Sequence, residues 1–181
     1  EKGDSVLIQQ PVYYPFSEVI RDNGRVVVSN DLYLGEDNRY HIDLADFEKK
    51  IVEYHVKLFL LCSPHNPTGR VFTKEELTAM GDLCVKHGVK VVSDEIHNDF
   101  VFQGEHTVFA SVKKEYEEIS VICTSPSKTF NLASMLISNI FIPNRSCTAE
   151  NLSAVKPQLC LINDPVIQLL RAKSASPEIQ P

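Results

Sequence analysis

Short apolar segments rich in β-branched residues alternate along this chain with segments of helical periodicity, and this alternation constrains the fold more than any other feature. Such alternation is typical of a parallel sheet whose two faces are covered by helices. We therefore predict an α/β fold of three layers, α/β/α, with a mainly parallel sheet. The predicted strands are residues 5–9, 25–29, 57–62, 89–93, 119–124 and 136–142.

Two helices carry clear local signals. The segment that begins at Asp43 repeats apolar residues on one face, at Leu44, Phe47 and Ile51. The second helix is predicted over residues 73–87, because Thr73 and Glu76 have the spacing of a capping box and Gly88 is typical of a helix end. Its apolar stripe consists of Leu77, Met80 and Cys84.

Composition excludes several classes of protein. The 181 residues are 43% hydrophobic and 23% charged, which suffices for one globular domain with a core. The net charge of -6 offers no basic face to nucleic acid or an anionic membrane, so we expect a small-molecule substrate and neither of those partners. The 5 cysteines form no C-x-x-C pair, which favours reduced core residues in a cytoplasmic protein. No apolar stretch approaches membrane-spanning length.

The two ends of the chain differ from its middle. The first residues, Glu1-Lys2-Gly3-Asp4, show neither an initiator methionine nor a signal-peptide pattern, which indicates a piece of a longer protein. Helical and strand periodicity weakens from Arg145 onward. We therefore predict a domain over residues 1–144 and a divergent, partly disordered tail over residues 145–181.

Three short motifs each end an apolar run, where a parallel sheet collects its ligands beyond the carboxyl ends of the strands. They are His65-Asn66-Pro67-Thr68-Gly69, Ser93-Asp94-Glu95-Ile96-His97 and Ser125-Pro126-Ser127-Lys128-Thr129. Together they indicate pyridoxal 5'-phosphate chemistry. That cofactor needs a lysine for a Schiff base, a carboxylate that keeps its pyridine nitrogen protonated, and a donor to its ring oxygen. Lys128, Asp94 and Asn66 supply one of each.

Each motif alone has a simpler interpretation. Asn-Pro and Thr-Gly are ordinary turn signals, and carboxylates at strand ends are often structural, although a buried Asp94 needs a partner. Asp94-Glu95-Ile96-His97 also matches a DExH helicase motif, but no phosphate-binding P-loop precedes it. A metal site on Asp94, Glu95 and His97 lacks further clustered ligands, so we expect no metal. His97 lies either near the cofactor's ring oxygen or on the surface.

Lys128 follows a buried strand and is flanked by Ser125 and Ser127. Hydroxyl and backbone N–H groups in such a strand-to-helix turn can bind a phosphate. Burial beside other positive charge would lower the pKa of Lys128 and free its amine for Schiff-base formation, so we expect a desolvated lysine here. Tyr13 or Tyr14 could stack on the pyridine face, or simply pack at a strand end.

With these motifs in hand, the chain resembles the fold-type I pyridoxal-phosphate enzymes, the class I and II aminotransferases in the broad sense. Within them it is most similar to the cystathionine β-lyase type of carbon-sulfur lyase. The likeness runs from Gly3-Asp4-Ser5-Val6-Leu7 and Pro11-Val12-Tyr13-Tyr14-Pro15-Phe16, through Ser127-Lys128-Thr129-Phe130-Asn131-Leu132-Ala133, to Ser138-Asn139-Ile140. It implies the large cofactor-binding domain of that fold.

The resemblance also implies a role for each site residue. Lys128 would be the catalytic residue that holds the cofactor as a Schiff base and moves the substrate's α-proton. Asp94 would pair with the pyridine nitrogen, Asn66 and His97 would lie at the ring oxygen, and Tyr13 would stack on the ring. Ser125 and Ser127 would contact the phosphate.

The reaction implied is β-elimination of a thiol from cystathionine or a cysteine conjugate. Two alternatives stay open: an aminotransferase, and a truncated large-domain fragment without catalysis. The family's glycine-containing phosphate loop and the arginine that binds the substrate carboxylate have no counterpart here, and Leu136 stands where many aminotransferases carry a phosphate-binding arginine. By resemblance we expect a homodimer.

Overall fold

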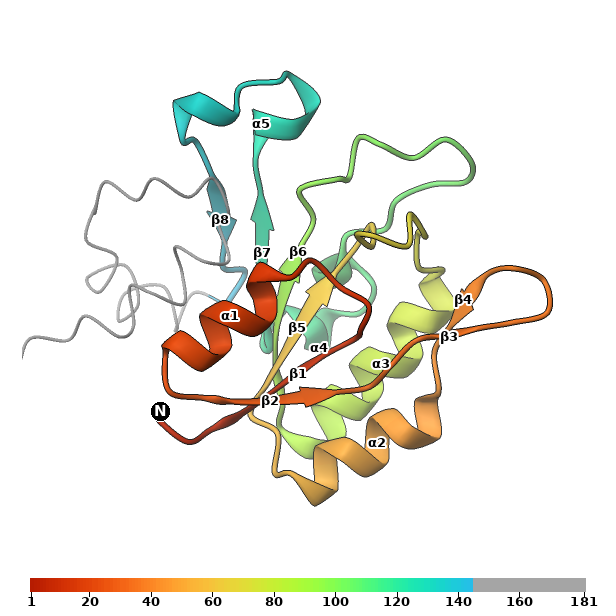
Figure 1. Ribbon diagram of the computed structural model, residues 1–181, viewed down its shortest axis with the longest axis vertical. Coiled ribbons are helices and arrows are strands. Elements are labelled where there is room, and N and C mark those ends of the chain that lie inside the picture. Colours follow the sequence, from red (N-terminus) through yellow and green to blue (C-terminus); the bar gives the residue numbers. More distant parts are fainter. Residues whose placement is uncertain (145–181) are drawn as a thin grey trace, which may run out of the picture.

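A six-stranded sheet forms the centre of the computed structural model, which describes residues 1–144 (Figure 1). Its strands are β1 (Ser5–Ile8), β2 (Val26–Ser29), β5 (Leu58–Cys62), β6 (Lys90–Asp94), β7 (Ser120–Thr124) and β8 (Asn139–Phe141). They lie in the order β2-β1-β5-β6-β7-β8, and all neighbours are parallel except β7 and β8. The mainly parallel sheet predicted from the alternation is therefore confirmed, with strand ends shifted by a few residues.

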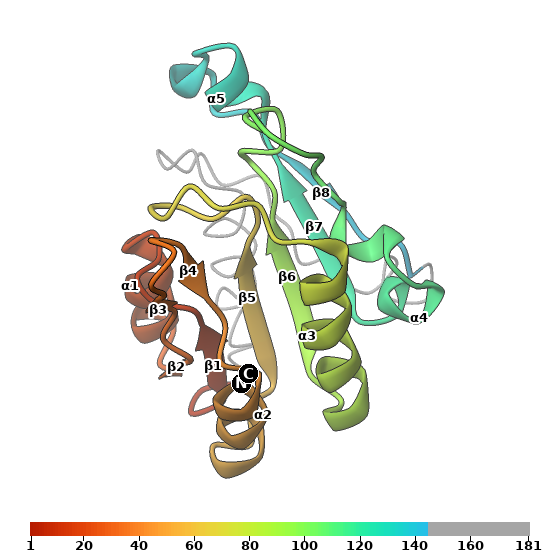
Figure 2. The same ribbon diagram turned by 90° about the vertical axis from the view of Figure 1, so that its right-hand side faces the viewer.

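Helices cover both faces of this sheet (Figure 2). Helix α1 (Pro15–Asp22) lies on one face, whereas α2 (Leu44–Glu53), α3 (Lys74–His87) and the short α4 (Lys114–Glu117) lie on the other. Side chains alternate across each strand, so neighbours on β5 enter different cores. Phe59 joins the core under α2 and α3, and Leu60 joins the core under α1. The three-layer architecture is thus confirmed.

Helix α3 begins and ends as the sequence predicts. The Thr73 hydroxyl accepts from the Glu76 backbone N–H at 3.2 Å, and the Glu76 carboxylate accepts from the Thr73 N–H at 2.9 Å. Gly88 ends the helix in the left-handed region, at a φ of 67°. Helix α2 is capped by Asp43, whose carboxylate accepts from the Asp46 N–H at 2.9 Å.

Several elements have no counterpart in the sequence prediction. Helix α1 is short, and tertiary burial of its apolar face stabilises it more than helix propensity does. A hairpin of β3 (Tyr33–Leu34) and β4 (Tyr40–His41) lies outside the main sheet. The chain also forms α5 (Pro126–Thr129) and two 3₁₀ turns, η1 (Phe109–Ser111) and η2 (Ala133–Met135).

The strand predicted over residues 136–142 begins later than expected. Leu136 has a φ of 55°, which a strand cannot contain, so β8 starts only at Asn139. The predicted tail, residues 145–181, lies outside the described residues, as do Cys147 and Cys160. Cys62, Cys84 and Cys123 are buried, as expected for core residues. Among the described residues, no helix is both long and apolar enough to span a membrane.

Candidate active site

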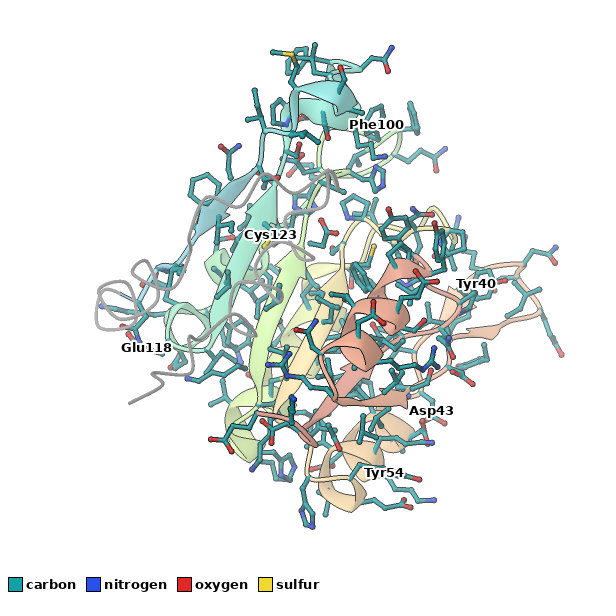
Figure 3. The ribbon with its side chains drawn as sticks, turned by 60° about the vertical axis from the view of Figure 1, so that its left-hand side comes forward. Tyr40, Asp43, Tyr54, Phe100, Glu118 and Cys123 are labelled. Carbon is teal, nitrogen blue, oxygen red and sulfur yellow. The ribbon has the colours of Figure 1, made fainter. Side chains whose placement is uncertain are left out.

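The carboxyl ends of β5, β6 and β7 bring the three motifs to one edge of the sheet. The register pairs Asp94 with Cys62 on one side and with Cys123 on the other, so the three strands end at the same level. Figure 3 shows Cys123 on β7 and Phe100 beyond this edge, on the loop that follows β6. A pocket opens here, lined by Tyr13, Cys62, Asn66, Asp94, Ile96, His97 and Lys128. The structure therefore brings together five residues that the sequence analysis selected.

Asn66 is held in place through its backbone. Its N–H donates to the Cys62 thiol sulfur at 3.4 Å, and its carbonyl accepts from the Tyr13 N–H at 2.9 Å. The second bond joins the turn after β5 to the segment after β1. The backbone contacts thus fix the side chains of Asn66 and Tyr13 at neighbouring positions on the pocket wall.

His65 stabilises the same turn from below. Its Nε2 lies 3.1 Å from the Gln9 carbonyl, which can only accept, and its Nδ1 lies 2.9 Å from the Thr68 hydroxyl. Nε2 is therefore the protonated nitrogen of a neutral ring. Burial lowers the pKa of His65 to about 4, which keeps the ring neutral at pH 7.

Asp94 places a buried carboxylate at the end of β6, with only 3% of its surface exposed. Its Oδ1 accepts from the Ile96 backbone N–H at 3.2 Å. On either side in the sheet stand the cysteines Cys62 and Cys123, whose thiols are weak hydrogen-bond partners. A buried carboxylate on the pocket wall can pair with a cationic group of a ligand.

His97 is half-buried on the pocket wall. Burial lowers the pKa of His97, and the positive charge of Lys128 lowers it further. The ring is consequently neutral near pH 7, and it can donate or accept a hydrogen bond.

Lys128 differs from its prediction in one respect. The sequence suggested a desolvated amine, but the Lys128 side chain is exposed although it lines the pocket. The physical reason is that α5 extends past the sheet edge, where the described residues leave its outer side open (Figure 2). The amine lies at the pocket mouth, accessible to a small molecule.

Ser125 and Ser127 lie at the start of α5 but not on the pocket lining. The Ser125 hydroxyl caps α5 by accepting from the Ser127 N–H at 3.0 Å. The Ser125 hydroxyl also lies 2.7 Å from the Ser127 hydroxyl and 2.7 Å from the Ile137 carbonyl. Both serines are buried, and they shape the turn that carries Lys128.

Sequence reasoning missed a second polar cluster behind the pocket. Glu95 is 1% exposed and contacts His106, whose Nε2 lies 2.8 Å from the Glu95 carboxylate. No partner for His106 was predicted from the sequence, because the two residues meet only through the folding of a loop. Glu95 therefore bonds within the protein, and the described residues contain no group of His, Cys, Asp and Glu that could hold a metal ion.

The pocket combines groups with distinct chemical capacities. Lys128 offers an accessible amine that can condense with an aldehyde, and Asp94 offers a buried charge for a protonated ring nitrogen. Asn66 and His97 offer hydrogen bonds, and the half-buried ring of Tyr13 offers an aromatic face. This donor set fits pyridoxal phosphate, the cofactor that the sequence predicts.

Comparisons with known proteins agree with a pyridoxal-phosphate enzyme. Cystathionine beta-lyase PatB of Bacillus subtilis is 49% identical over 146 residues, which are 80% of this chain and 38% of PatB. Protein MalY of Escherichia coli is 36% identical over 170 residues, which are 93% of this chain and 43% of MalY. The chain thus spans well under half the length of these relatives.

Solved structures share the fold. The structure of cystalysin from Treponema denticola, which contains a pyridoxal 5'-phosphate cofactor, superposes with a TM-score of 0.82 at 35% identity. The match covers 96% of this chain and 44% of cystalysin. The sequence profile for aminotransferase class I and II matches residues 1–178. This chain belongs to the class I and II aminotransferase family.

Proposed function

We propose that this chain is the cofactor-binding part of a pyridoxal-phosphate-dependent carbon-sulfur β-lyase. The observation that carries the proposal is the buried Asp94 carboxylate, which shares one pocket with the Lys128 amine. A buried charge opposite an accessible amine suits a ligand with a cationic ring nitrogen and an aldehyde. When bound, pyridoxal phosphate supplies an electron-poor ring that stabilises negative charge at the substrate's α-carbon.

The residues of the chain would hold this cofactor from several sides. Lys128 would bind its aldehyde, and Asp94 would pair with its ring nitrogen. Asn66 and His97 would bond its ring oxygen, and Tyr13 would stack on its face. Ser125 and Ser127 are buried at the first turn of α5, off the pocket lining, so we propose that they support the phosphate end of the site by shaping the turn that carries Lys128.

Lys128 would also serve as the base. Its exposed amine at the pocket mouth can reach a substrate's α-carbon, remove the α-proton and later return a proton. In the lyase reaction, Lys128 would take up this proton as a thiolate leaves the β-carbon, and in transamination Lys128 would give the proton back.

The lyase is favoured over the aminotransferase by the relatives. Among the curated relatives, PatB is named a cystathionine beta-lyase, and so is a Corynebacterium glutamicum protein that is 31% identical. We therefore propose cystathionine or a cysteine conjugate as the substrate.

We further propose a homodimer located in the cytoplasm. Support for the dimer comes from large apolar side chains that are exposed among the described residues, Phe130 at 66%, Met135 at 60% and Phe102 at 92%. Support for the cytoplasm comes from the cysteine pattern of the sequence, 5 residues without a C-x-x-C pair, of which Cys84 is a buried thiol.

Titration with pyridoxal phosphate, followed by its visible absorption spectrum, tests the cofactor. We expect a band that changes with Lys128→Ala and persists in Lys114→Ala, a control that removes an exposed lysine on α4. Borohydride reduction and peptide mapping should label Lys128. An unchanged band in Lys128→Ala would refute the assignment of the lysine.

Product analysis tests the reaction. With saturating cofactor and cystathionine, a lyase releases pyruvate, ammonia and a thiol. An aminotransferase given a keto acid instead releases a new amino acid and no thiol. Labelling of Lys128 without either product would favour the cofactor-binding fragment without catalysis.

A further inference from the structure

The loop between β6 and η1 carries His97 into the pocket, and its two ends are joined by one buried side chain. The Glu95 carboxylate, at the start of the loop, accepts from the Phe109 backbone N–H at its far end, at 3.0 Å. It also accepts from the Ser93 hydroxyl at 2.9 Å and from His106 Nε2 at 2.8 Å. Glu95 is buried and His106 is nearly so, with side-chain exposures of 1% and 9%.

A second contact ties the loop to the helix that carries Lys128. The Thr129 hydroxyl donates to the Asp99 carboxylate at 2.6 Å. His97 thus lies between Glu95, anchored to the sheet, and Asp99, anchored to α5 beside Lys128. Figures 1 and 2 show the loop after β6 rising beyond the sheet toward α5.

Geometry within the loop turns the His97 ring toward the pocket. The Asn98 N–H donates to the Glu95 carbonyl at 3.0 Å, and the Phe100 N–H donates to the His97 carbonyl at 2.9 Å. The Phe100 ring meets the His97 ring edge-on, with centroids 6.0 Å apart. These tight turns begin directly at Glu95, so a shift of its carboxylate would pass to His97 within two residues.

We propose that Glu95 and His106 are positioning residues that close this loop and hold His97 against Lys128 in the cofactor pocket. A carboxylate buried to this extent needs its donors, because an unpaired charge in the interior is costly. Loss of the His106 donor would weaken that closure. The loop would then open, and His97 would move into water.

The state of His97 itself reports on this closure, because both burial and Lys128 lower its pKa. The charged groups on the pocket lining beside it are Lys128 and Asp94. Opening of the loop raises the pKa of His97 toward its ordinary value of about 6.5. If the loop stayed closed, loss of the Glu95 charge would instead lower the pKa of His97, since removal of a nearby negative charge disfavours the protonated ring.

The test is an NMR titration of the His97 imidazole in the cofactor-free protein. His106→Ala should raise the pKa of His97, and His106→Gln, which keeps a donor toward Glu95, should restore the wild-type value. Glu95→Gln, which keeps the side-chain shape, should also raise it. Glu48→Gln is the matched control, because it breaks another carboxylate–imidazole contact, Glu48 to His87 at 2.9 Å, on the α2–α3 surface.

A wild-type pKa of His97 in His106→Ala, an equal rise in His106→Gln, or a fall in Glu95→Gln would each overturn the proposal. If His106→Ala does not fold, Glu95→Gln decides: the pKa of His97 should rise in Glu95→Gln and stay at the wild-type value in Glu48→Gln. The pyridoxal phosphate dissociation constant should rise about tenfold in His106→Ala, because a displaced His97 loses about one hydrogen bond to the cofactor. This last expectation rests on the proposed function: absence of cofactor binding in the wild type would refute that function and leave the His97 result standing.

Discussion

His65 is a neutral histidine inside the turn that carries Asn66, and its environment has a consequence for stability. Burial places its pKa at about 4 in the native protein, whereas the unfolded chain has the ordinary value of 6.5. Between these two values the unfolded chain binds a proton that the native protein does not. The free energy of unfolding therefore falls as pH falls from 6.5 to 4.

We expect this loss to approach about 3 kcal/mol, since each pKa unit corresponds to about 1.4 kcal/mol. His65→Gln removes the titrating ring, so the stability difference between wild type and variant should be largest at pH 7 and shrink toward pH 4. Urea denaturation at a series of pH values measures this stability difference. The contributions of carboxylates that titrate in both proteins cancel in it. A difference that stays constant with pH would contradict the assignment of a buried neutral ring.

Single residues differ in how well the sequence predicts them. Asn66, Asp94 and Lys128 were found because each follows a recognisable apolar strand, and parallel strands bring such positions together. The Glu95–His106 contact was missed because it spans 11 residues of a loop without periodicity. The exposure of Lys128 was also missed, because it depends on how far α5 extends beyond the sheet.

Helix α3 is the element that the sequence predicts best, because both of its ends are fixed by local side-chain chemistry. The capping box and the left-handed Gly88 need no distant partner. Helix α1 has only weaker signals, a proline at its first turn and the positive-φ Gly24 shortly after its end, and no side-chain cap. Local side-chain chemistry thus defines α3, whereas α1 depends more on the burial of its apolar face.

Removal of the α3 cap tests this local contribution. Thr73→Ala leaves the Glu76 N–H without its acceptor, and we expect a loss of about 1 kcal/mol in the free energy of unfolding. Thr78→Ala is the matched control within the same helix, because the Thr78 hydroxyl only bonds back to the Lys74 carbonyl. Urea denaturation measures both, and equal effects of the two substitutions would refute a special role for the cap.

Gly81 shows that α3 also depends on a distant neighbour. A Cβ at this position would overlap the ring of Tyr116. That ring is fixed by its hydroxyl, which lies 2.8 Å from the Thr78 carbonyl and 2.8 Å from the Asp82 carboxylate. The close approach explains a glycine in the middle of a helix, where it costs about 1 kcal/mol relative to alanine.

Gly81→Ala should therefore destabilise the protein by about 1–3 kcal/mol, the usual cost of overpacking, instead of stabilising the helix. Thermal unfolding measures the effect. In a Tyr116→Leu background the same substitution should cost less, because the rigid ring is gone. A gain in stability from Gly81→Ala in the wild-type background would show that the ring moves aside freely.

At the scale of the whole molecule, one sheet separates two cores. The α/β architecture was predictable because runs of apolar residues buried on both faces are typical of parallel strands. The antiparallel β8 was not distinguished, since its direction depends on how the chain turns back after η2. The sheet thus joins elements that the sequence predicts well with elements that it does not.

Because both cores share the same strands, we expect them to unfold together. Phe59 and Leu60 are consecutive on β5, fully or almost fully buried, and they pack into opposite layers. Phe59→Ala should cost about 3–5 kcal/mol and Leu60→Ala about 2–5 kcal/mol, and each should shift one common transition. Circular dichroism and tyrosine fluorescence, recorded through urea denaturation, should give coincident curves for both variants. Separate transitions for the two probes would mean that the layer of α1 and the layer of α2 and α3 fold independently, which the continuous hydrogen-bonded sheet between them argues against.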